Sequence, residues 1–327
     1  MTDELSRFDE LLQFDAAREC DRIVEALRRG VHALGRRGAV VGVSGGVDSS
    51  VVLALCTRAF DAEGVLAILS PDRDSAVDTV SLSRVAAAGA RVAVVEEDIT
   101  PILEALGCYR RRDEAVAGLI PGYTAEWKIK IVLPPVLGAS RLRVFTLVAE
   151  NPSGEQVSRR LPAEAYRSLL AAMNFKQRAR KILEYYHADR LGYAVAGTPN
   201  RLEFDQGFFV KNGDGAADVK PIAHLYKTQV YRLAEILEVP EPIRTRIPTT
   251  DTYPLEQTQE EFFFSLPLET LDLCLFGRDR HIAEEDVAAV TGLAREDVER
   301  VFADIDAKRR AGRYLHAPPL LLDQSST

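Results

Sequence analysis

The stretch Gly38–Phe60, GAVVGVSGGVDSSVVLALCTRAF, predicts a strand, a glycine-rich turn and a helix in immediate succession. Ala39–Val43 is a short continuous apolar run, which is typical of a strand buried on both faces of a parallel sheet. Ser44-Gly45-Gly46-Val47-Asp48-Ser49 forms the turn, and VVLALCTRAF continues as a helix. The turn therefore lies where a strand ends and a helix begins.

Similar segments recur on both sides of this stretch. Short apolar runs predict further buried strands, and amphipathic or apolar runs between them predict helices. Strands that alternate with helices over short links indicate a doubly wound α/β fold with a parallel sheet. The predicted strands are Val65–Leu69, Arg91–Val95 and Tyr193–Ala196, and the predicted helices are Phe8–Arg29, Asp78–Ala88, Thr228–Leu237 and Ala163–His187, the last as one helix or as two that meet near Met173.

The alternation is interrupted between residues 108 and 171. The sequence predicts a loop over residues 108–127, and then a β-hairpin from Lys128–Val132 and Leu142–Val148. The run Arg110-Arg111-Arg112 is interpreted as solvated surface, with a phosphate clamp as the alternative. We expect one domain over residues 1–327, with this hairpin as an insertion of about 108–171.

The C-terminal third predicts a long loop followed by helices. Pro248–Pro267 is rich in Thr, Pro and Gln, which favours a loop. Ile282–Ala311 reads as two helices separated by Thr291-Gly292, within a helical end of about 282–318.

Composition narrows the functional classes. The chain has 327 residues, a net charge of −8 and four cysteines, none of them in a C-x-x-C pair. This balance disfavours a nucleic-acid partner and a zinc or disulfide framework. The N-terminus lacks a signal-peptide pattern and no run of about 18 apolar residues occurs, so we expect a cytoplasmic chain with no membrane association.

The turn at residues 44–49 has the chemistry of an anion site. Glycines let backbone N–H groups approach an anion, and the helix N-terminus adds unpaired N–H donors and the positive end of the helix dipole. Asp48 would be repelled by a phosphate unless a cation lies between them, so its presence predicts Mg²⁺. The turn lacks the spacing of the Walker loop and of the dinucleotide fingerprint.

The turn resembles the S-G-G-x-D-S loop of the N-type ATP pyrophosphatases. Further motifs follow in order: Gly197–Glu203 (GTPNRLE), Gly207–Asp218 (GFFVKNGDGAAD), Pro221–Val230 (PIAHLYKTQV) and Pro248–Asp251 (PTTD). Together they resemble ammonia-dependent NAD synthetases over roughly residues 38–107 and 172–318. The resemblance implies the adenine nucleotide alpha hydrolase-like fold, a homodimer with the acceptor site at the subunit interface, and the use of ATP and Mg²⁺.

The resemblance also implies roles for individual residues. Asp48 and Glu203 would hold Mg²⁺, and Asp48, Lys227, Thr249 and Asp218 would serve catalysis, with Asp218 as a proton acceptor for ammonium. Asn174, Lys211, Asp214 and Asp218 would bind the acceptor. The implied ATP-binding residues are Gly42, Ser44, Gly45, Gly46, Val47, Asp48, Ser49, Arg178, Thr198, Lys227 and Thr249.

The chemistry implied is amide formation through an acyl-adenylate. A carboxylate, deamido-NAD in the family, receives AMP from ATP, pyrophosphate leaves, and ammonia then displaces AMP. One alternative is the same chemistry on another carboxylate, which the inserted segment and the departures around Thr249–Pro254 favour. A second alternative is a non-catalytic nucleotide-binding partner protein, which the intact Asp48, Glu203, Lys227 and Thr249 disfavour.

Overall fold

The computed structural model describes residues 6–138, 144–250 and 252–321. At its centre is a four-stranded parallel sheet of order β3-β2-β1-β7, made of β1 (Ala39–Gly42), β2 (Val65–Leu69), β3 (Ala93–Glu96) and β7 (Ala194–Ala196). These strands and their parallel pairing confirm the predicted α/β fold. Each of these strands begins and ends within two residues of its predicted bounds, and β2 matches its predicted bounds at both ends.

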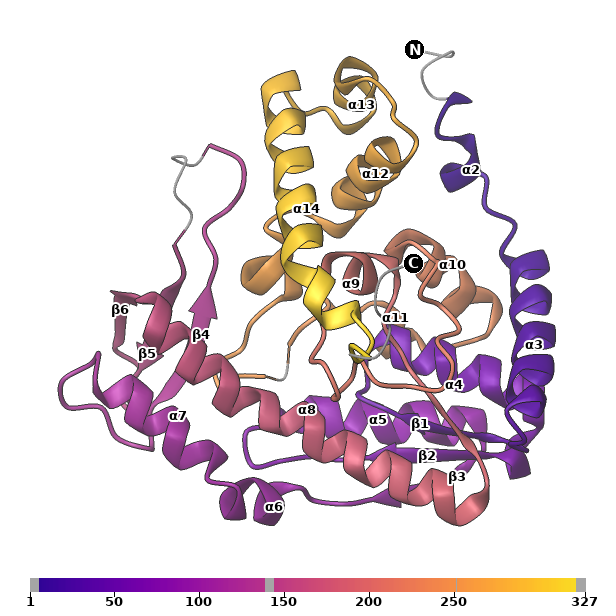
Figure 1. The fold of residues 1–327 in the computed structure, drawn as a ribbon, viewed down its shortest axis with the longest axis horizontal. Coiled ribbons are helices and arrows are strands. Elements are labelled where there is room, and N and C mark those ends of the chain that lie inside the picture. The colour runs from indigo at the N-terminus through magenta and orange to yellow at the C-terminus, as the bar shows by residue number, and fades with distance from the viewer. Residues whose placement is uncertain (1–5, 139–143, 251, 322–327) are drawn as a thin grey trace.

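Side chains on the two faces of the sheet enter different cores. Ala39, Val41 and Ala67 pack with α3 (Ala16–Ala33), α4 (Val47–Phe60) and α10 (Lys227–Ile236). Val40, Leu66 and Val195 instead face α8 (Ala163–Leu191), which crosses the other side of the sheet (Figure 1). Helix α5 (Val77–Ala90) contacts α4 and β2. The alternation follows from the period of two along each strand, so both faces are apolar and covered.

Three structural predictions in the first half of the chain were wrong. Residues 108–117 form a helix, α7 (Cys108–Ala117), after a short α6 (Thr100–Ala105), and not a loop. The hairpin is a three-stranded antiparallel sheet of β4 (Lys128–Val132), β5 (Thr146–Glu150) and β6 (Gln156–Arg160). The first predicted strand is correct, whereas part of the second, Leu142–Val148, falls on residues 142 and 143, outside the described residues. The single helix expected at Phe8–Arg29 is divided into α2 (Asp9–Leu12) and α3, because the Asp15 side chain caps α3 by accepting from the Arg18 N–H.

The appended sheet has its own apolar core. Ile129, Ile131 and Leu147 alternate inward and are fully buried against Leu169 and Met173 of α8. Helix α8 is therefore one continuous helix that belongs to both parts: its first turns cover the appended sheet and its later turns cover the parallel sheet (Figure 1). Of the two alternatives predicted for Ala163–His187, one helix or two, the structure shows one helix.

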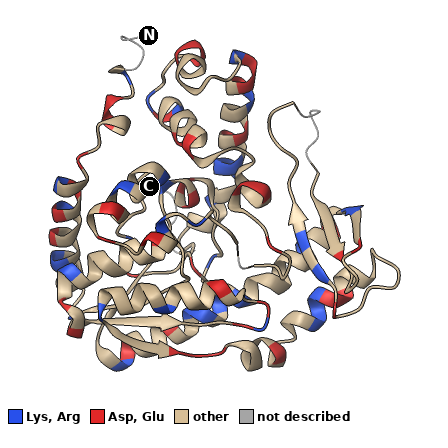
Figure 2. Cartoon of the chain, turned by 180° about the vertical axis from the view of Figure 1, so that it is seen from behind, with Lys and Arg blue, Asp and Glu red and all other residues tan. Residues whose placement is uncertain are grey.

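Further helices make up most of the C-terminal part of the chain. They are α9 (Arg201–Gln206), α11 (Glu241–Arg244), α12 (Leu268–Asp279), α13 (Glu284–Thr291) and α14 (Arg295–His316), with a π-helical turn at Glu260–Phe264. The pair α13 and α14 confirms the two helices predicted over Ile282–Ala311. The π-helical turn lies inside the predicted loop Pro248–Pro267, which is therefore wrong for these residues, and α9 and α12 lie in segments where no helix was predicted. Acidic and basic residues are interspersed along the outer helices (Figure 2). Within the described residues no helix combines the length and the apolar character that a membrane span needs.

Candidate active site

The phosphate loop predicted from the sequence connects β1 to α4. Gly45 has φ +73°, and a Cβ on it would lie 2.7 Å from the Thr79 carbonyl oxygen, so only glycine fits there without a shift of backbone. Ser49 Oγ donates to the Gly46 carbonyl oxygen at 3.1 Å and accepts from the Ser44 N–H at 3.2 Å. Hydrogen bonds within the loop thus hold its conformation. The first N–H groups of α4, like those of any helix, have no partners inside the helix and can bind an anion.

Four polar residues from three segments meet beside this loop. Asp48, in the first turn of α4, forms an ion pair with the ammonium group of Lys227, the first residue of α10. Asn200 Nδ2 donates to the other Asp48 oxygen at 3.2 Å, and its backbone N–H donates to Glu203 Oε2 at 3.1 Å. Asn200 and Glu203 form the capping box of α9, so the start of this helix fixes the Glu203 carboxylate next to Asp48. The structure therefore brings together Asp48, Glu203 and Lys227, as predicted.

This cluster carries shifted pKa values. Burial, together with the negative charge of Asp48, raises the pKa of Glu203 to about 8 against the opposing effect of Lys227. Burial alone would lower the pKa of Lys227, but the charges of Asp48 and Glu203 outweigh it and the pKa is raised. Two carboxylates thus share one buried ammonium group, and a further positive charge would be stabilised beside them.

The donor set at this place fits Mg²⁺. Asp48 and Glu203 offer hard carboxylate oxygens, the ligands that Mg²⁺ takes together with substrate phosphates. Burial and the charge of Asp48 disfavour the ionised form of Glu203, which a divalent cation would stabilise. No group of three or more His, Cys, Asp or Glu with metal-site geometry occurs among the described residues, so phosphate and water oxygens would complete the coordination.

The raised pKa of Glu203 predicts a pH-dependent stability. Between pH 4.5 and 8 the folded protein holds a proton that the unfolded chain has lost, so the free energy of unfolding falls as pH rises through this range and levels off above it. We expect a loss of about 1–2 kcal/mol from pH 6.5 to 8.5, reduced by water in the cavity. Urea unfolding of the protein without nucleotide measures it, and Glu203→Gln should flatten this slope. An unchanged slope in the variant, with exposed Glu25→Gln as the control, would contradict the assignment.

A cavity of about 620 Å³ opens over the phosphate loop and receives most of the predicted residues. It is bounded by the carboxyl ends of β1 and β2, by α8, and by the segments before α9 and after α11. The predicted residues that line it are Gly42, Ser44, Gly46, Val47, Asp48, Ser49, Asn174, Arg178, Thr198, Glu203, Lys211, Asp214, Lys227 and Thr249. Gly45, which is not among them, acts through the loop conformation described above.

The predicted acceptor residues have structural partners of their own. Lys211 Nζ donates to the carbonyl oxygens of Tyr314 and Ala317 at 2.9 and 2.8 Å, and so holds the end of α14 over the cavity. Asp214 Oδ1 accepts from the Val210 N–H at 2.7 Å, which closes the glycine-rich turn. Burial raises the pKa of Asp214. Arg178 Nε donates to the Lys211 carbonyl oxygen at 3.3 Å, so α8 and this turn are joined at the cavity wall.

Asp218 is the one predicted site residue that the structure places away from both the cavity lining and the loop. Its Oδ2 accepts from the Val195 N–H at 2.8 Å, and its Oδ1 accepts from the Tyr185 hydroxyl of α8 at 3.4 Å. The first contact extends the pairing of β7, the short edge strand of the sheet. Within a single chain Asp218 therefore contacts β7 and α8 and not the phosphate loop.

Sequence reasoning missed several residues of the cavity. Lys181 and Glu184 of α8 lie within the lining as an almost fully buried ion pair, 2.5 Å apart. Arg180 lines it too, and Tyr166, Phe262 and Phe263 form an aromatic part of the wall. The helical spacing from Asn174 and Arg178 to Lys181 would have indicated the first pair, because residues three and four apart share one helix face.

Comparison with known proteins agrees with this geometry. A sequence model of the NAD synthase family matches residues 19–118 and 151–311. The chain belongs to the NAD synthase family. The NH(3)-dependent NAD(+) synthetases of Mesorhizobium japonicum and Rhizobium meliloti are 55% and 53% identical to it, over 95% of this chain and 98% and 93% of theirs. Residues 119–150, between the ranges matched by the NAD synthase model, include β4 and β5.

The solved structures show that the fold is shared as well. The NH3-dependent NAD synthetase of Campylobacter jejuni superposes with a TM-score of 0.62 over 95% of this chain and 100% of that chain, at 20% identity. The overall fold of this chain is thus shared with that NAD synthetase.

Proposed function

We propose that this chain forms NAD from deamido-NAD, ATP and ammonia, with release of AMP and pyrophosphate. The observation that carries the proposal is the meeting of Asp48, Glu203 and Lys227 at the phosphate loop, inside a cavity of about 620 Å³. The ammonia-dependent NAD synthetases that are more than half identical to this chain support the choice of reaction and acceptor.

The reaction has two displacement steps. An oxygen of the nicotinate carboxylate attacks the α-phosphorus of ATP, the bond to the bridging oxygen breaks, and pyrophosphate leaves with its electron pair. Unprotonated ammonia then attacks the carbonyl carbon of the acyl-adenylate, AMP leaves, and the new amide loses a proton. Neither step needs a covalent protein nucleophile, so the protein has to bind, orient and stabilise charge.

The phosphate side of the cavity has the groups for the first step. The N–H groups at the start of α4 would bind the departing pyrophosphate, and Lys227 would stabilise the negative charge that develops on it. Thr249, which lines the cavity from the opposite side, would donate its hydroxyl to a phosphate oxygen. Asp48 and Glu203 would hold Mg²⁺, whose charge offsets that of the phosphates.

The other cavity residues would bind the rest of the substrates. Arg178 and Thr198 would contact ATP, and Asn174, Lys211 and Asp214 would face the acceptor. Lys211 donates two hydrogen bonds to carbonyl oxygens at the end of α14. It would therefore both fix this end of the helix and pair with a negative charge of the acceptor.

A homodimer would give Asp218 its role. Ile182 and Tyr186 of α8 are 63% and 59% exposed, so this helix presents apolar side chains at the surface. Asp218 reaches it through the Tyr185 hydroxyl. We propose that a second copy covers this surface and completes the acceptor site, where Asp218 would accept a proton from ammonium.

This dimer makes a direct prediction. Tyr186→Glu places a charge in the proposed interface and should convert the dimer to a monomer, with the loss of amide formation and an unchanged fold by circular dichroism. Sedimentation velocity at several concentrations measures the change. Tyr314→Glu, at another exposed tyrosine, on α14, is the control for sedimentation only. A wild-type chain that sediments as a monomer would reject the dimer.

The experiment for the function combines deamido-NAD, ATP, Mg²⁺ and ammonium chloride, and follows NAD and AMP by chromatography. Equal amounts of NAD and AMP, dependent on all four components, would support the proposal. Parallel reactions with glutamine in place of ammonium, and with nicotinic acid mononucleotide in place of deamido-NAD, test the nitrogen source and the acceptor. A folded protein that binds ATP and forms no NAD would overturn the deamido-NAD assignment.

A further inference from the structure

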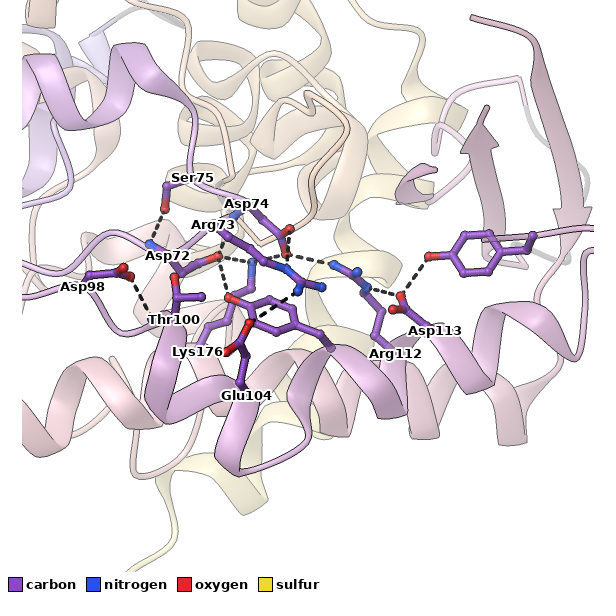
Figure 3. A network of polar contacts seen from close by, with 12 residues as sticks. Asp72, Arg73, Asp74, Ser75, Asp98, Thr100, Glu104, Arg112, Asp113 and Lys176 are labelled. Carbon is purple, nitrogen blue, oxygen red and sulfur yellow. Dashed lines mark hydrogen bonds and ion pairs between the residues drawn. The ribbon is translucent and has the colours of Figure 1, made fainter. Parts of the chain in front are cut away.

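A buried group of charged side chains lies beside the cavity, where α7 and α8 meet the segment that follows β2 (Figure 3). Lys176 Nζ is 2.9 Å from Asp72 Oδ1 and 2.9 Å from Asp74 Oδ2. Arg112 Nη1 of α7 is also 2.9 Å from Asp74 Oδ2. The side chains of Lys176, Arg112 and Asp72 are only 1%, 2% and 0% exposed. The interpretation of Arg110–Arg112 as solvated surface was therefore wrong for Arg112.

On one side the network reaches the cavity. Asp72 Oδ2 accepts from Arg180 Nη2 at 3.0 Å, and Arg180 Nε donates to the Ser70 carbonyl oxygen at 3.0 Å. The Asp72 N–H donates to Ser75 Oγ at 3.0 Å. Ser70, Ser75 and Arg180 all line the cavity. Asp72 thus bonds both to Ser75, within the cavity wall at residues 70–75, and to the guanidinium group of Arg180 on α8.

On the other side the network reaches the appended sheet. Arg112 Nε donates to Asp113 Oδ1 at 2.8 Å, and the Tyr123 hydroxyl donates to the same oxygen at 2.9 Å. Tyr123 packs on the apolar core of the appended sheet, with its ring centroid 6.0 Å from that of Trp127. A continuous series of contacts therefore joins this sheet to the wall of the cavity.

Stability alone does not account for such a network. Burying charges has a large desolvation cost, and apolar side chains of similar size often give equal or greater stability. What the charges add is a fixed arrangement, because each carboxylate oxygen is held by a defined donor. Burial would raise the pKa of Asp72, but Lys176 and Arg180 outweigh it and the pKa is lowered, so the carboxylate stays ionised.

We propose that this network positions the ATP-binding wall: it fixes residues 70–75 and orients Arg180, with the appended sheet as its outer support. Arg180 lies across the carboxyl end of β2 with its Nε and Nη2 groups bonded inside the protein, and it keeps a partly exposed edge at the cavity. That edge would donate to an anionic oxygen of ATP. The inference rests on the proposed use of ATP and adds positioning residues to it.

Lys176→Met tests the proposal, because it keeps the length of the side chain and removes its charge. We expect the KM for ATP to rise about tenfold, with the KM for deamido-NAD and ammonium within twofold. Direct ATP binding, measured by titration calorimetry well below the unfolding temperature, should weaken by the same factor. Arg278→Met breaks an ion pair between α12 and α14 that does not line the cavity, and it should leave the KM for ATP unchanged.

Three further substitutions keep the test decisive if Lys176→Met fails to fold. Tyr123→Phe removes only the outer hydroxyl and should raise the KM for ATP about twofold to threefold, and Arg112→Lys should retain more ATP affinity than Arg112→Met. Lower unfolding temperatures with an unchanged KM for ATP would overturn the positioning role. A wild-type protein that binds no ATP would instead reject the proposed function, which separates the two failures.

Discussion

Replacing Asp48 by asparagine should lower the rate of NAD formation about 10³-fold, the largest effect expected from any single side chain. Asparagine keeps the size of the side chain and its contact with Asn200 but removes the charge that pairs with Lys227 and that would hold Mg²⁺. The loss should appear in kcat and in the exchange of labelled pyrophosphate into ATP. Steady-state assays at saturating ATP measure the first, and isotope exchange measures the second.

The same substitution has a cost in stability that must be separated from catalysis. Without Asp48 the buried ammonium group of Lys227 loses its ion-pair partner, which destabilises a protein by roughly 3 kcal/mol. The double variant Asp48→Asn with Lys227→Met removes both charges and should regain stability without activity. Asp297→Asn, which removes a carboxylate from the first turn of α14, should keep full activity. An Asp48→Asn enzyme with near-normal pyrophosphate exchange would refute the role of Asp48.

Gly45→Ala should reduce kcat/KM for ATP at least 100-fold. A Cβ at this position would lie 2.7 Å from the Thr79 carbonyl oxygen and 3.0 Å from the Ser83 nitrogen, both backbone atoms of α5, and φ is +73°. The loop must therefore move, and a displacement of about 1 Å in a phosphate site is enough for an effect of this size. The left-handed conformation adds about 1–2 kcal/mol of strain. Steady-state kinetics and thermal unfolding report the two effects separately.

Two other glycines serve as comparisons for Gly45. Gly35 also has a positive φ, +69°, but a Cβ there meets nothing within 4 Å, so Gly35→Ala should lower stability without affecting ATP. Gly46 has φ −86°, and its Cβ would meet only Ser44 Oγ, at 3.5 Å. Gly46→Ala should fold almost normally and still bind ATP poorly, because the methyl group would project where the phosphate approaches. Equal ATP affinity in all three variants would exclude this loop as the phosphate site.

The sequence by itself determined the parallel sheet and the strand-to-helix turn at residues 44–49. The strands that contain Val40, Leu66 and Val195 are buried on both faces of the sheet. A continuous apolar run of a few residues predicts such a strand without information from the rest of the chain. Gly45 and Asp48 act within one strand-to-helix turn, where a few consecutive residues decide the conformation. Glu203 was found through its motif, although the six-residue helix that orients it, α9, was not among the predicted helices.

Tertiary structure decided the features that depend on distant partners. Helix α7 was missed because its buried face contains Arg112, a residue that an apolar pattern does not count. Arg112 is buried only because Asp74, 38 residues earlier, supplies the compensating charge. Asp218 matched its motif, but the position of α8 directs it toward Tyr185 and away from the phosphate loop. Such pairings join segments whose separation along the chain leaves no local trace, so only the packed molecule reveals them.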